Sequence, residues 1–193
     1  MKVTDKITIT NEDCMELLKR TPDNFYDLSI CDPPYGINAD KKNSKKELKT
    51  KKSATLSKDY GSQEWDSEVP NLEYFNELKR VSKNQIIWGG NYMLQSMSAS
   101  GKCDINTPCW IMWDKKFSED VTFAQFELAW TSFKTSAKKF ESSPNQLNRI
   151  HPTQKPVALY KWLLDKYSKQ LDKEYFDKAM ERINNHTQQQ KLF

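Results

Sequence analysis

The sequence has few glycines, few histidines and no long apolar run. Only five of its 193 residues are glycine and none follows Gly101, so residues 102–193 lack the glycine-rich turn that lets a backbone approach a nucleotide closely. Its only histidines are His151 and His186, which argues against a histidine-rich metal site. No stretch reaches the roughly 18–20 apolar residues of a membrane-spanning helix, and the first ten residues lack the apolar core of a secretory signal.

The cysteine content indicates a reducing compartment. The four cysteines show neither the spacing of a zinc site nor the density of a disulfide scaffold. The length suits one sizeable domain. We therefore expect a single cytoplasmic domain over residues 1–193, without a bound metal.

The positive charge is concentrated in one segment. The formal net charge is +4, yet eight lysines fall between Lys41 and Lys58 against a single acid, Glu47. Residues 38–63 also lack apolar periodicity, so we expect a mobile loop there. Such a loop is often only a solvated surface, but binding to nucleic-acid phosphates is favoured here because the loop closely follows the motif "DPPYG". The lysines assigned to this contact are Lys41, Lys42, Lys45, Lys46, Lys49, Lys51 and Lys52.

Apolar patterns predict alternating strands and helices. The runs "FYDLSIC", "NQIIW", "CWIMWDK" and "FELAWTSF" are typical of buried strands. The stretches "NLEYFNELKRV" and "TQKPVALYKWLLDKY" have the spacing of amphipathic helices, the second with Thr153 as a candidate cap. This alternation favours an α/β fold with a largely parallel sheet and flanking helices.

The stretch "SICDPPYG" places useful side chains directly after a strand. Two consecutive prolines cannot continue a sheet ladder, so the strand should end at Cys31 and leave Asp32 and Tyr35 on a stiff loop. Ligands of open α/β sheets bind at this end of the strands. Asp32 and the carbonyl group of Pro33 can accept hydrogen bonds from an exocyclic amine, while Tyr35 offers a flat face for stacking.

These groups suit the methylation of an amine on a purine ring. The lone pair of such an amine is delocalised into the ring, which makes the nitrogen a poor nucleophile. Two acceptors that hold its hydrogens favour a pyramidal nitrogen able to attack an electrophilic methyl group. The amine is not accessible in this way inside a duplex, so the base must be flipped out. Alone, "DPPY" is also compatible with a proline-stiffened turn that carries an exposed aspartate.

Five segments in this order resemble the DNA amino-methyltransferases: "DPPYG", "IIWGGN", "CWIMWDK", "FELAWTSF" and "HPTQKP". The early "DPPY" and late "HPTQKP" resemble the β-class arrangement, and "DPPY" rather than "SPPY" favours adenine over cytosine. The resemblance implies a Rossmann-like methyltransferase fold, S-adenosylmethionine as cofactor and double-stranded DNA as substrate. Methylation of RNA or of protein amides is a weaker alternative.

The resemblance also assigns roles to individual residues. The residues implied to hold the flipped base are Asp32, Pro33, Pro34 and Tyr35. Those implied to lie against the methionine part of the cofactor are His151, Pro152, Thr153, Gln154, Lys155 and Pro156. We expect further contacts to DNA phosphates from basic residues near the end of "FELAWTSF" and beyond it, namely Lys134, Lys138, Lys139 and Arg149.

The chain departs from this family after "LLDKYSKQ". The family pattern continues there with a strand, a glycine-rich cofactor loop, a helix and a second strand, whereas this chain runs directly into "LDKEYFDKAMERI". A unit of roughly 30 or more residues is therefore missing between Gln170 and Leu171. Three explanations stay open: a natural deletion that leaves a catalytically inactive DNA-binding remnant, a chain completed by a partner or a second copy, and an incomplete gene product.

Overall fold

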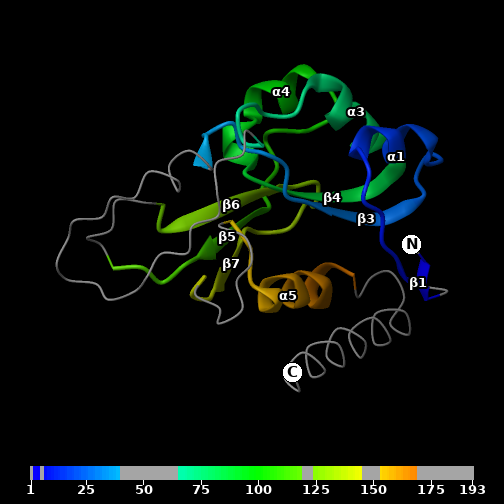
Figure 1. The fold of residues 1–193 in the computed structure, drawn as a ribbon. Helices are drawn as coiled ribbons and strands as arrows, with labels where there is room; N and C mark the ends of the chain where they lie inside the picture. The colour runs from blue at the N-terminus through cyan, green and yellow to red at the C-terminus, as the bar shows by residue number, and fades with distance from the viewer. Residues whose placement is uncertain (1, 5–6, 40–64, 119–123, 145–152, 169–193) are drawn as a thin grey trace.

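The computed structural model describes residues 2–4, 7–39, 65–118, 124–144 and 153–168, and these form a mixed α/β structure (Figure 1). The strands are β1 (Lys2–Thr4), β2 (Ile7–Thr8), β3 (Tyr26–Cys31), β4 (Ser82–Trp88), β5 (Trp110–Asp114), β6 (Phe126–Thr131) and β7 (Lys138–Glu141). The helices are α1 (Cys14–Arg20), α3 (Leu72–Val81), α4 (Leu94–Ala99) and α5 (Val157–Tyr167), with a short 3-10 turn, η1 (Gly90–Tyr92). Within these ranges, none of the helices has the length and apolar composition that crossing a membrane requires.

Within the described residues, the main sheet contains five strands in the order β3-β4-β6-β5-β7. Strands β3 and β4 are parallel, as are β5 and β7, whereas β6 is antiparallel to both β4 and β5. The expected α/β class is confirmed. The sheet is mixed rather than largely parallel as predicted, because β6 inserts between β4 and β5. Strand β3 was predicted to be buried. It lies instead at an edge of the described sheet and is half-buried.

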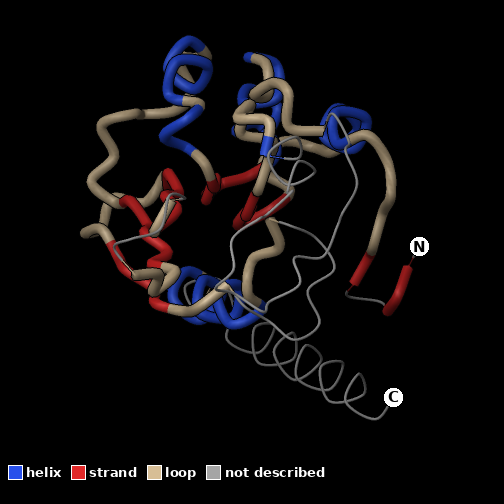
Figure 2. Tube along the Cα trace, turned by 60° about the vertical axis from the view of Figure 1, so that its left-hand side comes forward, coloured by secondary structure: helices blue, strands red, loops and turns tan. Residues whose placement is uncertain are grey.

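Helices cover both faces of the sheet. Figure 1 shows α1, α3 and α4 on one face and α5 on the opposite face, and Figure 2 shows the same arrangement after a turn of 60°. One apolar core lies on the α3 and α4 side and includes Phe75, Ile87 and Trp130. The other lies on the α5 side and includes Trp88 and Leu159. The two cores fix the sheet between its helical layers.

The ends of the helices follow their local sequence, with one exception. The side chain of Asn71 caps α3 by accepting a hydrogen bond from the backbone N–H of Tyr74 at 3.0 Å. Helix α5 begins directly after Pro156, which makes no side-chain cap bond. The prediction that Thr153 caps this helix is therefore wrong, because the chain from Thr153 to Pro156 is not yet helical.

The loops after β3 and β4 are brought together by the parallel pairing of these strands. Cys31 pairs with Ile87, so the two strands end side by side. Strand β3 ends at Cys31 as predicted, and Gly36 has the left-handed φ of +68° that lets the loop turn. Gly89 also has a φ of +68° and lies directly against the ring of Tyr35.

We predict that Gly89→Ala destabilises the protein more than Gly101→Ala. Both glycines have a left-handed φ, where a side chain costs about 1 kcal/mol. A Cβ at Gly89 would lie 2.3 Å from Cε1 of Tyr35, whereas a Cβ at Gly101 would meet no atom within 4 Å. The added clash should bring the loss in free energy of unfolding at Gly89 to about 2–4 kcal/mol. Equal losses in urea denaturation would contradict the close packing of Tyr35 on Gly89.

Candidate functional site

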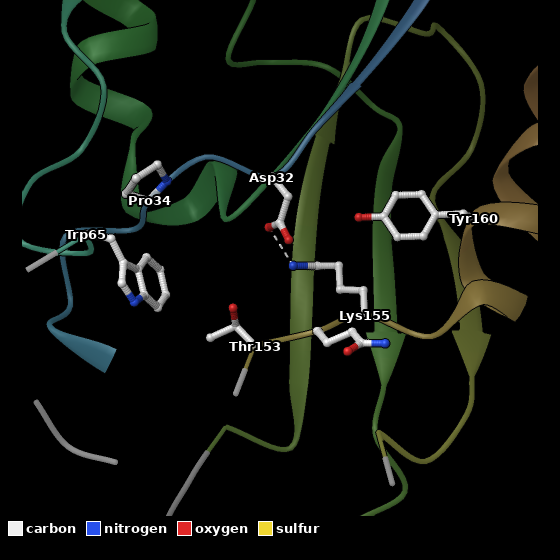
Figure 3. A pocket seen from close by; sticks show the side chains of 7 residues that line it. Asp32, Pro34, Trp65, Thr153, Lys155 and Tyr160 are labelled. Atoms are coloured by element: carbon white, nitrogen blue, oxygen red, sulfur yellow. Dashed lines mark hydrogen bonds and ion pairs between the residues drawn. The ribbon is translucent and has the colours of Figure 1, made fainter. Parts of the chain in front are cut away.

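The "DPPY" and "HPTQKP" segments meet through a buried lysine. The ammonium nitrogen of Lys155 lies 2.5 Å from Oδ1 of Asp32 and 2.9 Å from the hydroxyl oxygen of Tyr35. The Tyr35 hydroxyl group also lies 2.9 Å from the same Asp32 oxygen. Lys155 and Asp32 are 123 positions apart in the sequence, and Figure 3 shows their side chains pointing toward one another. Two segments singled out from the sequence therefore form one cluster.

Glu127 is a member of this cluster that the sequence did not reveal. It lies on β6, with Oε2 at 3.1 Å from the ammonium nitrogen of Lys155 and 3.2 Å from the Tyr35 hydroxyl oxygen. Its Oε1 lies 2.7 Å from the ammonium nitrogen of Lys115. The available signal was the lone acid in the apolar strand "FELAW", because a charge in such a strand needs a compensating partner.

The charges of the cluster balance one another. The Lys155 side chain is only 2% exposed, and it pairs with Asp32 and Glu127 while Lys115 pairs with Glu127. Burial raises the pKa of Glu127, but the positive charges of Lys155 and Lys115 outweigh burial and hold this pKa below its ordinary value. Burial, with the negative charges of Glu127 and Asp32, raises the pKa of Tyr35. The tyrosine therefore keeps its proton and donates a hydrogen bond to a carboxylate.

A cavity of about 540 Å³ opens beside the Asp32–Lys155 ion pair. It is lined by Asp32 and Pro34 of the "DPPY" segment, and by three residues that precede α5, namely Thr153, Gln154 and Lys155. Trp65 and Tyr160 complete the lining, and Figure 3 shows them on opposite sides of the ion pair. Residues predicted to hold the base and residues predicted to hold the cofactor thus face one cavity.

The ring of Tyr35 is packed within the protein and does not line this cavity. It stacks on Tyr92 with ring centroids 5.4 Å apart and an angle of 20° between the planes. Gly89 lies against the same ring. The aromatic side chains that face the cavity are instead Trp65 and Tyr160.

Asp66 holds the "DPPYG" loop in place. The residue is 1% exposed, and its Oδ1 accepts hydrogen bonds from the backbone N–H groups of Tyr35 at 2.6 Å and Gly36 at 3.0 Å. Its Oδ2 accepts a third from Ala39 at 2.9 Å. The sequence did not reveal this role, because no local pattern links Asp66 to a loop 30 positions earlier. The carboxylate makes the loop rigid where Asp32 meets the cavity.

The remaining predicted residues are less informative. Pro33 is half-buried and Pro156 is buried, and neither lines the cavity. Lys134, Lys138 and Lys139 are exposed; Lys134 pairs with Asp104, and Lys139 pairs with Glu141, so their charges are partly neutralised. The lysines of residues 41–52, with Arg149, His151, Pro152 and the stretch "LDKEYFDKAMERI", lie outside the described residues.

Comparisons with known proteins identify no family: no protein-family model matches the chain, and no curated protein matches it. Across the part of the chain that the structure describes, no three histidine, cysteine, aspartate or glutamate side chains gather in a way that could hold a metal ion. The geometry of the cavity and its charge cluster is therefore the basis for a functional assignment.

We expect Asp66→Ala to destabilise the protein by about 2–4 kcal/mol, because three backbone donors lose a charged acceptor. Asp66→Asn keeps one acceptor oxygen and should cost less. Urea denaturation measures both losses, and amide hydrogen exchange at Tyr35, Gly36 and Ala39 should accelerate.

The matched control is Asp165→Ala on α5, which removes only an ion pair with Lys161 at 3.4 Å. Such a pair contributes about 0.3–0.5 kcal/mol. A loss for Asp66→Ala no larger than this control would contradict the anchoring role.

Proposed function

We propose that the chain binds a flipped adenine of DNA and presents its exocyclic amine for methylation. One observation carries the proposal: Asp32 of "DPPY" and residues 153–155 of "HPTQKP" line the same cavity. A methyltransferase needs such an arrangement, because the amine and the methyl donor must meet at one point. The cavity volume of about 540 Å³ lies within the range of small-molecule sites.

Asp32 is the proposed acceptor for the amine. Its side chain is 32% exposed and borders the cavity, so a carboxylate oxygen can receive a hydrogen bond from a bound ligand. A planar ring with its amine at Asp32 would lie beside Trp65 or Tyr160, and stacking contributes about 1–3 kcal/mol per base. This arrangement revises the expectation that the base stacks on Tyr35, whose ring is stacked on Tyr92.

The residues present fit one end of the proposed donor. S-adenosylmethionine would supply an electrophilic methyl group on a sulfonium cation. Aromatic faces and a carboxylate suit that cation, and Trp65, Tyr160 and Asp32 offer them in this cavity. The nucleoside end has no such counterpart in the sequence, because no glycine follows Gly101. The fit is therefore limited to the methyl-donating end.

The chemistry of the chain's own residues is positioning. The Asp32 carboxylate would hold a hydrogen of the amine and favour a pyramidal nitrogen with an accessible lone pair. Asp66 keeps the loop that carries Asp32 rigid, so little reorganisation is needed when the base binds. Packing of Tyr35 on Gly89 restricts the loop from the other side.

A second candidate is a base-binding subunit that a partner completes. Two observations favour it: the second half of the chain lacks a glycine-rich loop, and β3 lies at an edge of the described sheet. In a Rossmann-like methyltransferase fold, further strands would pair at that edge. Under either candidate we propose a cytoplasmic protein that acts on double-stranded DNA, with phosphates contacted by the lysine-rich segment at residues 41–52.

We predict that the protein transfers a labelled methyl group from S-adenosylmethionine to adenine in unmethylated genomic DNA, and that Asp32→Ala lowers the rate by about 10²–10³. The reason is that this variant removes the acceptor of the amine. Asp165→Ala, on α5 and outside the cavity lining, should leave the rate unchanged.

A rate unaffected by Asp32→Ala would contradict the assignment of the amine site. Absence of transfer, together with absence of S-adenosylmethionine binding in calorimetry, would favour the partner-completed subunit. Tight binding of the cofactor by this chain alone would exclude an inactive remnant.

A further inference from the structure

Among the described residues, only one of the two Asp32 carboxylate oxygens accepts hydrogen bonds. Oδ1 receives both the ammonium group of Lys155 and the hydroxyl group of Tyr35. No donor among the described side chains or backbone groups bonds to Oδ2. A carboxylate has about four acceptor positions, so Oδ2 can serve a ligand while Oδ1 keeps the side chain fixed.

Both groups that contact Oδ1 also contact Glu127, although the Tyr35 hydroxyl group has only one proton to donate to the two carboxylates. Oε2 of Glu127 lies 3.1 Å from the ammonium nitrogen of Lys155 and 3.2 Å from the hydroxyl oxygen of Tyr35. A nearly fully buried ammonium group needs such compensation. Lys115 holds the other oxygen of Glu127 at 2.7 Å. The position of the Asp32 carboxylate therefore depends on Glu127 of β6.

We propose that Glu127 is a positioning residue, which acts through Lys155 and Tyr35 to direct Oδ2 of Asp32 toward the exocyclic amine of a bound base. The inference rests on the proposed function, in which Asp32 accepts that amine. Glu127 does not line the cavity, so it has no direct contact with the base.

Loss of the Glu127 charge has a specific consequence for Asp32. Lys155 is then left with Asp32 as its only anionic partner among the described residues. The ammonium group can donate to both Asp32 oxygens, and it competes with the amine for Oδ2. The site should therefore lose its preference for a ligand with an amine rather than its capacity to bind a planar ring.

Adenosine and purine riboside provide the test, because they differ only in the exocyclic amine. Titrations followed by NMR chemical shifts give the two affinities. We expect the wild-type protein to bind adenosine about tenfold more tightly than purine riboside, because a hydrogen bond to a charged group contributes a free energy of about this size. In Glu127→Gln the ratio should fall to within about twofold of one, with the affinity for purine riboside retained.

Two further variants make the test independent of a folding defect. Glu141→Gln on β7 removes an exposed acid that pairs with Lys139 and Lys116, and should leave the ratio unchanged. Tyr35→Phe removes the hydroxyl group between Glu127 and Asp32 but keeps the ring. It should lower the ratio, and it replaces Glu127→Gln in the test if that variant does not fold.

The outcomes separate the inference from the function on which it rests. A wild-type ratio near one would overturn the amine contact at Asp32, and the positioning role with it. A tenfold ratio that persists in Glu127→Gln would overturn the positioning role alone. Equal weakening of both nucleosides, with the ratio retained, would also overturn it, because that result assigns Glu127 to stability only.

Discussion

The ion pair between Lys155 and Asp32 is the interaction on which the site depends. It joins the loop after β3 to the segment before α5, and it places an ammonium group where only 2% of the lysine side chain is exposed. Removing such a charge from water costs several kcal/mol. The cost is offset by Glu127 and by the hydroxyl group of Tyr35, which surround the same nitrogen. The site is consequently a closed network with balanced charge.

The network gives the base-binding half of the proposed methyltransferase site a well-formed geometry. Asp66 fixes the backbone of the "DPPYG" loop, and Tyr35 packs against both apolar cores, so Asp32 borders the cavity in a defined position. Rigid placement of this kind is what the orientation of an amine requires. The nucleoside end of a methyl donor has no comparable support, because the sequence lacks a glycine after Gly101. Base binding is therefore better supported than catalysis by the chain alone.

Features set by local chemistry were predictable from the sequence, and features set by distant contacts were not. The end of β3 at Cys31 followed from the two consecutive prolines after Asp32. Pairing of β6 between β4 and β5 depends on neighbours far apart in the chain, so the mixed sheet was not foreseen. Glu127 and Asp66 were missed for the same reason, since Lys155 lies 28 positions from Glu127 and Tyr35 lies 31 positions from Asp66. The resemblance to a methyltransferase identified both ends of the ion pair, but not the pair itself.

A double-mutant cycle between Asp32 and Lys155 tests the central claim most directly. Asp32→Asn, Lys155→Met and the double variant would be compared with the wild-type protein by urea denaturation at pH 7. If the two side chains depend on one another as the geometry indicates, the effects on the free energy of unfolding should be non-additive by about 1–3 kcal/mol. Additivity to within about 0.5 kcal/mol would contradict the account, because it would mean that the two segments do not interact.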